Sequence, residues 1–363
     1  MHIIAYYLPQ YYPFKENNEW WGEGFTEWTN VGKAKPLFRH HDQPKVPSSL
    51  GYYDLRLDEV KEKQIKLAKE AGVTAFCYWH YWFGNGRMLL DLPLKQVIKN
   101  QELDFPICLG WANETWMAKV WNHDGSFSGK NLIEQLYPGD NDIIEHFNKI
   151  LCVIRDKRYL KIDNRPVFVI YKPLQHPCLH HFMHIWNDLI KESGVGDSFF
   201  FIGHTVNVEE IYNIKSLGVD AVNIVRIGEY RYNKNVISKI PFKLFAFKFL
   251  HRPLVLRYSF ISKYFINENI DKNEDIIPTL IPNWDHTPRS GKRGVVFHKS
   301  NGSDFEKHAI RALNVIKGKC PSRQILFLKS WNEWGEGNYM EPDLNNGKAF
   351  IKALKSAIDK VFK

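Results

Sequence analysis

The chain has few cysteines, and their arrangement indicates neither a disulfide framework nor a metal site. Five occur among 363 residues, an odd number without C-x-x-C spacing. Cys77 and Cys108 lie inside apolar runs, where a small buried thiol is common. The segment "HPCLHH" (176–181) lacks the spacing of a zinc site. We therefore expect a reduced chain that holds no metal and no other cofactor.

Long hydrophobic runs are missing as well. No stretch of about 18 apolar residues is present that could span a membrane. The first residues, "MHIIAYYLPQ", have neither the basic nor the apolar region of a secretory signal. No G-x-G-x-x-G follows the first apolar run, which argues against a dinucleotide-binding fold. These absences predict a cytoplasmic protein.

The charge is basic but not concentrated in one run. The formal net charge is +9, from 49 Lys and Arg against 40 Asp and Glu, and we find no nucleic-acid motif. We expect no nucleic-acid partner. The excess of positive charge either keeps the protein soluble or attracts a phosphate-bearing partner, such as a nucleotide sugar, a lipid-linked pyrophosphate or an anionic membrane.

What the chain does contain is one repeated theme, in which short apolar runs alternate with segments of helical periodicity. The apolar runs cover residues 2–9, 73–82, 106–112, 166–173, 199–205, 221–227, 278–284 and 324–331. The helical segments cover residues 58–72, 91–100, 141–156, 179–193, 207–217, 303–317 and 347–362. The runs are apolar on both faces, as buried parallel strands are. Eight such units predict an α/β fold, a single (β/α)8 TIM barrel over residues 1–363.

Two connections are longer than a barrel needs. They follow the first predicted strand (10–53) and the sixth (228–277), and we expect the second to be an insertion in the barrel. Within it, residues 241–265 interleave Lys and Arg with Phe, Leu and Tyr. This pattern fits a helical subdomain packed against the barrel. It also fits a basic amphipathic surface in peripheral contact with the inner face of a membrane.

The stretch "SWNEWGEGNYMEPD" (330–343) follows the eighth strand and places glutamates among tryptophans. Residues three apart in a strand point to opposite faces, so Glu333 and Glu336 share the barrel mouth only if the chain leaves the extended state. Gly335 and Gly337 permit that. Two carboxylates near aromatic surface suit glycosidic chemistry, in which one is protonated and the other ionised. Alternatively, either glutamate forms a rim salt bridge with Arg or Lys.

The other strand ends carry polar and aromatic residues suited to a sugar pocket. Active sites of such barrels form at the carboxyl ends of the strands. On this argument the candidate substrate-binding residues are Tyr6, His80, Trp111, Asn113, Glu114, Tyr171, His204, Arg226 and Trp284, together with Glu23, Asn332, Trp334 and Glu341 from the acidic aromatic motifs. Any one of them can instead be structural. Glu341 in particular could bind either a sugar hydroxyl or a backbone amide.

The motifs "YYLPQYYPFKENNEWWGEGFTEWTNV", "PLFRHHDQPKVP", "LGYYDLR", "CYWHYWF", "GWANETW", "RPVFVIYKP" and "WNEWGEGNYMEPD" together resemble the WbsX-type glycosyltransferase family. That family is similar to glycoside hydrolase family 99, the endo-α-mannosidases and endo-α-mannanases. The resemblance covers nearly the whole chain and implies a (β/α)8 barrel that acts with retention at the anomeric carbon. It implies that Glu333 assists the sugar's 2-hydroxyl in attacking C1, and that Glu336 is the general acid and then the base. Gly335 stands where the hydrolases commonly carry histidine.

The resemblance also implies a role in bacterial surface-polysaccharide assembly, as for O-antigen or capsule. The expected partners are an oligosaccharide or lipid-linked glycan, and a nucleotide sugar as donor. Three functions are open at this point. The first is a glycan-active enzyme, most simply a glycosyltransferase, and the second is a retaining endo-α-mannosidase-like glycoside hydrolase. The third is a non-catalytic glycan-binding barrel, which the intact glutamate pair disfavours.

Overall fold

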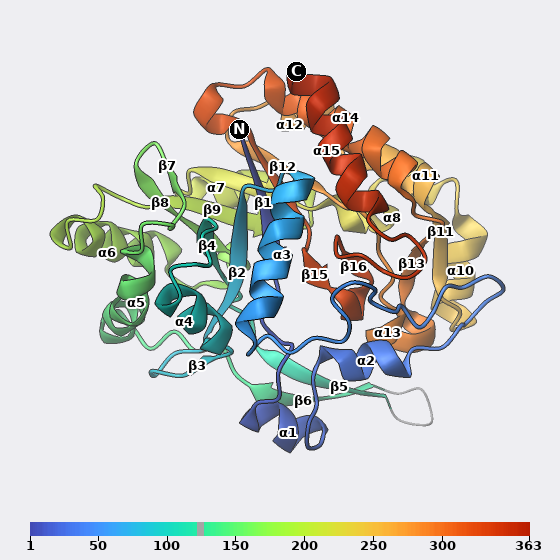
Figure 1. The fold of residues 1–363 in the computed structure, drawn as a ribbon, viewed down its shortest axis with the longest axis horizontal. Helices are drawn as coiled ribbons and strands as arrows, with labels where there is room; N and C mark the ends of the chain where they lie inside the picture. Colours follow the sequence, from blue (N-terminus) through green and yellow to red (C-terminus); the bar gives the residue numbers. More distant parts are fainter. Residues whose placement is uncertain (122–126) are drawn as a thin grey trace.

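The computed structural model describes residues 1–121 and 127–363 of the chain, and at its centre is a closed sheet of parallel strands (Figure 1). The barrel strands are β1 (His2–Tyr7), β2 (Ala75–Trp82), β4 (Ile107–Trp111), β8 (Arg165–Ile170), β9 (Phe200–Thr205), β10 (Ala221–Ile224), β12 (Ile276–Leu280) and β14 (Ile325–Leu328). Their order around the sheet is β1-β14-β12-β10-β9-β8-β4-β2, and β2 pairs with β1 to close it. The predicted (β/α)8 barrel is confirmed.

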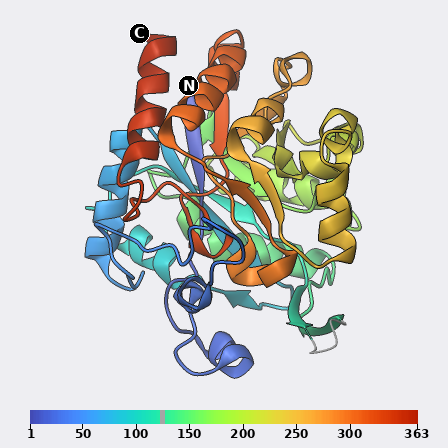
Figure 2. The ribbon, with the colours of Figure 1, turned by 90° about the vertical axis from the view of Figure 1, so that its right-hand side faces the viewer.

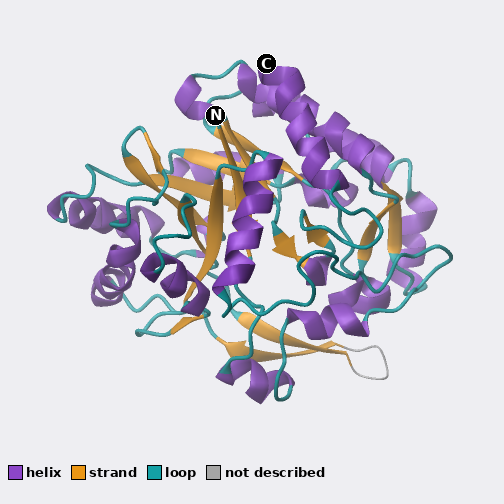
Figure 3. Ribbon diagram, in the orientation of Figure 1, coloured by secondary structure: helices purple, strands orange, loops and turns teal. Residues whose placement is uncertain are grey.

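Helices surround the strands, as Figure 3 shows. The outer helices are α3 (Asp58–Ala71), α4 (Leu92–Lys99), α5 (Asp140–Ile154), α6 (Leu179–Glu192), α7 (Ile211–Ser216), α14 (Gly302–Lys317) and α15 (Ala349–Phe362). Local signals set their ends: Gly72 caps α3 in the left-handed region at φ 83°, and the Asn301 side chain accepts a hydrogen bond from the Asp304 amide at the start of α14. Figure 2 shows both chain termini at the same end of the molecule.

Several predicted strands extend past the ends of the observed ones, and two of these cases lead into a second core. The run 221–227 forms a strand only as far as Ile224, and a 3-10 turn, η3 (Arg226–Gly228), follows. The run 278–284 was placed too late, because β12 ends at Leu280. Ile281 is apolar for a different reason, since it is buried in a second hydrophobic core beside the barrel. Apolar character extends past the strand because a neighbouring core begins where the barrel ends.

The first long connection carries two short helices, α1 (Lys15–Trp21) and α2 (Glu27–Lys33). The connection after β4 contains an antiparallel pair that the sequence analysis missed, β5 (Trp116–Trp121) and β6 (Phe127–Ile133). The remaining small elements are β3 (Met88–Leu89), β7 (Lys161–Ile162), η1 (Pro173–Gln175), η2 (Val208–Glu210), η5 (Gly291–Arg293) and η6 (Pro321–Arg323).

The connection after β10 is a mixed insertion rather than a purely helical one. Its elements are α8 (Glu229–Tyr232), α9 (Lys234–Ile237), α10 (Pro241–Phe249), β11 (Leu254–Arg257), α11 (Tyr258–Ile261), η4 (Ser262–Tyr264) and α12 (Glu268–Asp271). β11 pairs in parallel with β13 (Val295–His298), which follows β12 and the short helix α13 (Thr287–Ser290). The second core therefore joins the insertion to the connection after β12.

In the described part of the chain, no helix is long and apolar enough to cross a bilayer.

Candidate active site

The segment after β14 folds back as a small hairpin at the carboxyl end of the barrel. It consists of β15 (Asn332–Glu333), the 3-10 turn η7 (Trp334–Glu336) and β16 (Asn338–Tyr339). The extended conformation ends at Glu333, whose ψ is 67°, and Gly337 takes the left-handed conformation at φ 55°. The chain thus leaves the extended state between the two glutamates, as the glycines indicated.

The two glycines serve different purposes. Gly337 supplies the positive φ, which favours glycine. Gly335 is not in that region. A Cβ atom at position 335 would instead overlap Glu27 Oε2 and lie 3.1 Å from Arg289 Nε. Gly335 is therefore required because the side chains of Glu27 and Arg289 approach it closely, and not because of the turn itself.

Those side chains belong to a buried charge cluster that gathers both glutamates. Arg289, on α13, brings Nη1 within 3.0 Å of Glu333 Oε1 and 2.7 Å of Glu336 Oε1, while Nη2 lies 3.0 Å from Glu27 Oε2. Lys329 Nζ lies 3.7 Å from Glu333 Oε2 and 3.9 Å from Glu336 Oε2. The carboxylates therefore meet at the same two cations. Pairing with arginine, the alternative weighed for either glutamate, holds for both: Glu333 is buried, and Glu336 and Arg289 are partly buried.

This environment shifts the pKa values of the two carboxyl groups in opposite directions. Burial, and then the neighbouring Glu336 carboxylate, raise the pKa of Glu333. Burial acts in the same direction on Glu336, but the Arg289 guanidinium, a hydrogen bond from His286 and the Lys329 ammonium hold the pKa of Glu336 well below its ordinary value. His286 Nε2 lies 3.4 Å from Glu336 Oε1. In the free protein, Glu333 is thus the glutamate that takes up a proton first.

Two tyrosines and a third carboxylate border the pair. Burial, and then the carboxylates of Glu114, Glu336 and Glu333, raise the pKa of Tyr171. Burial, followed by Glu333, likewise raises the pKa of Tyr81, and Glu114 adds to this. The pKa values of Tyr171 and Tyr81 thus respond to Glu114 as well as to the glutamates of the hairpin.

Aromatic rings form the floor of this region inside the barrel. Tyr6 and Trp79 are stacked with centroids 4.5 Å apart, and Trp79 meets the ring of Tyr171 edge-on at 5.2 Å. His204 lies 4.7 Å from the Tyr171 ring, and burial lowers its pKa to about 3, so its imidazole is neutral. The Tyr6 hydroxyl donates across the barrel to Asn223 Oδ1. Tyr6, Tyr171 and His204 therefore lie together inside the barrel, although β1 is not adjacent to β8 or β9 in the sheet.

Trp284 adjoins the charge cluster from the connection after β12. Its ring stacks on His286 at 5.7 Å, and Lys329 Nζ lies 5.8 Å from the ring centroid. Since His286 and Lys329 both approach Glu336, the structure brings Trp284 to the edge of the site.

Two of the predicted residues face away from the barrel interior. The Nε2 atoms of His80 and His146 are 2.8 Å apart, so His80 contacts α5 in the helical layer. Side chains alternate along a strand, and it is Trp79 and Tyr81 on either side of His80 that face inward. The indole of Trp111 is also buried and donates to a backbone carbonyl of β2.

Three more predicted residues are engaged elsewhere or exposed. Arg226 forms a buried two-point ion pair with Asp271, at 2.7 and 2.6 Å. Asn113 is buried and donates to the Tyr137 hydroxyl. Glu23 is exposed in the turn between α1 and α2. The structure gives Arg226 and Asn113 partners that hold loops in place.

The last three predicted residues hold the hairpin itself. The Asn332 amide accepts from the Leu8 backbone amide at 2.8 Å and donates to the Leu8 carbonyl at 3.0 Å. Trp334 is fully buried and stacks on Tyr339 at 3.8 Å, while its indole nitrogen donates to Glu341 at 2.6 Å. These contacts join the hairpin to the end of β1.

Glu341 is the centre of that support. Its carboxylate also accepts hydrogen bonds from the Tyr53 hydroxyl at 2.9 Å and from Gln64 at 2.7 Å. Burial raises the pKa of Glu341 to about 7, although the hydrogen bonds from Trp334, Gln64 and Tyr53 oppose the rise. The sequence left a sugar hydroxyl and a backbone amide open as partners of Glu341; the donors found are side chains, and sugar binding by Glu341 stays a prediction.

The sequence analysis missed most of the cluster around the glutamates. The residues missed are Glu27, Trp79, Tyr81, His286, Arg289 and Lys329. Alternation along β2 could have found the two aromatics, and Lys329 directly follows β14. No local pattern marks Arg289, because its partners are distant in sequence.

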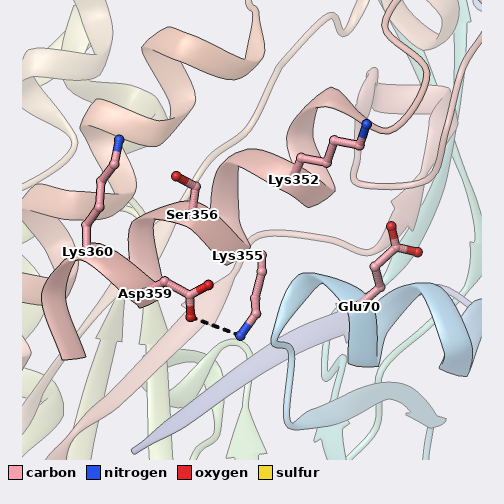
Figure 4. Close-up of a pocket in the computed structure, with 6 residues that line it drawn as sticks. All are labelled: Glu70, Lys352, Lys355, Ser356, Asp359 and Lys360. Carbon is pink, nitrogen blue, oxygen red and sulfur yellow. Dashed lines mark hydrogen bonds and ion pairs between the residues drawn. The ribbon is translucent and has the colours of Figure 1, made fainter. Parts of the chain in front are cut away.

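A hollow on the opposite side of the fold is not a competing site. It has a volume of about 490 Å³ and lies between α3 and α15, lined by Glu70, Lys352, Lys355, Ser356, Asp359 and Lys360 (Figure 4). Its charged groups pair with near neighbours, as Lys355 does with Asp359 at 3.0 Å. It lies outside the helical layer, away from the strand ends.

The family model for "Glycosyltransferase WbsX" matches residues 3–354. The chain belongs to the WbsX glycosyltransferase family. Two curated relatives from strains of Xanthomonas campestris pv. campestris, both named "Uncharacterized protein WxcX", are 31% identical to it over 98% of this chain. The match covers 49% of each relative, so this WbsX-family chain spans about half the length of the curated relatives it matches.

Solved structures share the fold at low sequence identity. The GH99 endo-alpha-mannosidase from Bacteroides thetaiotaomicron is 16% identical, with a TM-score of 0.56 over 99% of the WbsX-family chain and 97% of the mannosidase. A protein described as glycoside hydrolase-like is 13% identical, with the same TM-score over 92% and 99% of the two chains. These likenesses concern the barrel and leave the chemistry to the site.

Proposed function

We propose that this WbsX-family chain makes or breaks an α-glycosidic bond with retention, most simply by glycosyl transfer in the assembly of a bacterial surface polysaccharide such as an O-antigen or capsule. The observation that carries the proposal is the meeting of the Glu333 and Glu336 carboxylates at one arginine, at the carboxyl end of β14. Family membership supports a carbohydrate substrate. The proposed substrate is an oligosaccharide or lipid-linked glycan at the cytoplasmic face of the membrane, with a nucleotide sugar as donor.

The reaction proceeds in two steps. In the first, Glu333 takes the proton of the sugar's 2-hydroxyl, whose oxygen attacks C1, while the bond from C1 to the leaving group breaks and Glu336 gives a proton to the departing oxygen. That oxygen belongs to the phosphate of a nucleotide sugar in transfer and to a glycosidic bond in hydrolysis. In the second, an acceptor hydroxyl gives its proton to Glu336 and attacks C1. The bond between C1 and the 2-oxygen breaks, and the 2-oxygen recovers its proton from Glu333. Two inversions at C1 give net retention.

These roles require a rearrangement at Arg289. Glu336 must carry a proton to act as the acid, whereas Arg289 and His286 favour its ionised form in the free protein. The proposal therefore has the bound sugar displace Arg289 from Glu336. Glu27 can retain the guanidinium afterwards, because it already contacts Arg289 through both Nε and Nη2, at 3.2 and 3.0 Å.

The test incubates the purified protein with free or lipid-linked glycans, with and without nucleotide sugars, and follows product by mass spectrometry. Donor-dependent extension of the glycan supports transfer. Release of reducing sugar without a donor replaces transfer by hydrolysis. The Glu333→Gln and Glu336→Gln variants should lose either activity, and full activity in both would overturn the assignment. Glycan binding without turnover in any condition would leave only a binding role.

A further inference from the structure

The helix α10 presents an aromatic face to solvent. Phe242, Phe245 and Phe249 are 74%, 51% and 67% exposed, and the rings of the last two lie 5.0 Å apart. Their spacing of three and four residues puts all three on one side of the helix. Leu250, just beyond the helix end, is exposed as well. Apolar side chains gathered in this way mark an interaction surface.

The opposite side of α10 is anchored. Leu244 and Phe247 pack against the second core, which also contains the buried residues Leu254 and Leu256 of β11. Figures 1 and 2 show α10 outside β11 at the edge of the molecule. The helix is thus held by one apolar face, while no residue of the described ranges 1–121 and 127–363 covers the other, which is made of three phenylalanines.

The segment that carries this face has charged side chains of one sign. Residues 230–267 contain eight Lys and Arg and no Asp or Glu, whereas the whole chain has a net charge of only +9. At 100° per residue, Lys243 and Lys248 fall on the two flanks of the aromatic face. Both are exposed, as are His251 and Arg252 just after the helix. An apolar centre bordered by cations matches a partner with an apolar interior and an anionic surface.

We propose that α10 is a bilayer-binding helix that lies in the plane of an anionic phospholipid membrane. The three phenylalanine rings enter the boundary between headgroups and acyl chains, and Lys248 and Arg252 contact lipid phosphates, while Lys243 Nζ is held by the Val255 carbonyl at 2.8 Å. Peripheral contact of this kind needs no spanning helix. Trp284 packs against the same core as α10, so one hydrophobic core connects the proposed lipid-binding helix with the edge of the candidate active site.

The experiment measures co-sedimentation of the full chain with vesicles of phosphatidylcholine alone and of phosphatidylcholine with about one-quarter phosphatidylglycerol. Binding should be at least tenfold stronger to the anionic vesicles and should fall with added salt. The triple variant Phe242→Ser/Phe245→Ser/Phe249→Ser should lose at least tenfold in binding. The matched control is Tyr212→Ser, which removes another ring, 80% exposed on α7, and should bind as the wild type does.

Three results would overturn the proposal: equal or absent binding of the wild type to the two kinds of vesicle, retention of binding by the triple variant, or equal loss in Tyr212→Ser. Light scattering provides a fourth. If the wild type is a dimer that binds no lipid, and the triple variant is a monomer, a second copy of the chain and not a membrane covers the aromatic face. The urea midpoint should be the same for all variants, since every changed ring is exposed. No readout depends on catalysis, so this proposal and the glycosidic one fail separately.

Discussion

Replacing Arg289 by methionine should leave three buried carboxylates close together with too little positive charge. The side chains of Glu27, Glu333 and Glu336 are 5%, 10% and 15% exposed, and Arg289 contacts all three within 3.0 Å. Lys329 would remain, but at 3.7 Å or more from the two glutamates of the hairpin. Methionine keeps most of the apolar volume of the side chain, so the change removes mainly the charge and its hydrogen bonds.

The expected loss of stability is large at neutral pH. Removing one partner of a buried ion pair costs about 3–5 kcal/mol, because the remaining charge is left without compensation. With an unfolding entropy of about 2.1 cal/mol/K per residue, this corresponds to a fall in Tm of about 4–7 °C for a chain of this length. The loss belongs to the folded state, since the carboxylates are hydrated in the unfolded chain.

The loss should also depend on pH. In the wild type, the low pKa of Glu336 stabilises the fold above the ordinary glutamate pKa, and that contribution disappears as pH falls through the lower, folded-state value. Without Arg289, the buried carboxylates acquire raised pKa values, and the folded state binds protons more tightly than the unfolded state. The difference between variant and wild type should therefore shrink as pH falls from 8 to 5.

Urea unfolding followed by tryptophan fluorescence at pH 8, 6.5 and 5 measures both effects. The control is Arg39→Met, which removes an exposed arginine and should leave the midpoint unchanged. If Arg289→Met unfolds at the wild-type midpoint at pH 8, the buried cluster is not a source of stability. A deficit of the same size at pH 5 would show that lost packing, and not charge, explains it.

Three further predictions concern the hairpin and its support. Glu333→Gln and Glu336→Gln should each lower turnover by about 10²–10⁴-fold in the glycan assay. Glu333→Gln should leave the urea midpoint at or above that of the wild type, because burial and Glu336 raise the pKa of Glu333, whereas Glu336→Gln should lower the midpoint, because it removes the charge that Arg289 stabilises. Wild-type turnover in either variant, or a raised midpoint in Glu336→Gln, would contradict this. Gly335→Ala should lower the free energy of unfolding by about 1–3 kcal/mol, because its Cβ would overlap Glu27 and approach Arg289. The control is Gly32→Ala, whose Cβ would have nothing within 4 Å, and it should be neutral or slightly stabilising. Burial raises the pKa of Glu341 to about 7 from an ordinary 4.5, so its protonation stabilises the fold fully below pH 4.5, and about 3 kcal/mol of this stability is lost as pH rises through 7. In Glu341→Gln, the free energy of unfolding should not fall with pH over this range. If it falls as in the wild type, another group is responsible for the pH dependence.

Much of the barrel was predictable because its strands carry their own signal. A parallel strand buried on both faces must be apolar throughout, and the helices between have one apolar stripe. The errors came where apolar residues serve another core, as at Ile281, or where short strands such as β5 and β6 lie outside the barrel. Periodicity reports that a residue is buried, but not which core buries it.

The candidate site was predictable only in its own segment. Glycines at 335 and 337 indicated a departure from the extended state, and the structure has one between Glu333 and Glu336. The reason for Gly335 could not be read from the hairpin, since Glu27 and Arg289 create the constraint. His80 was misplaced because a strand-end position alone does not say which face a side chain takes.

By itself, the sequence determined the closed barrel and the bend that carries two glutamates, because both depend on burial patterns and backbone freedom within a few residues. Only the tertiary structure decided how those glutamates are charged. Their pKa values depend on Arg289, which is itself held by Glu27 from 262 positions away. Electrostatic interactions act through space, so the raised pKa of Glu333 and the lowered pKa of Glu336 follow from which distant elements the fold brings together.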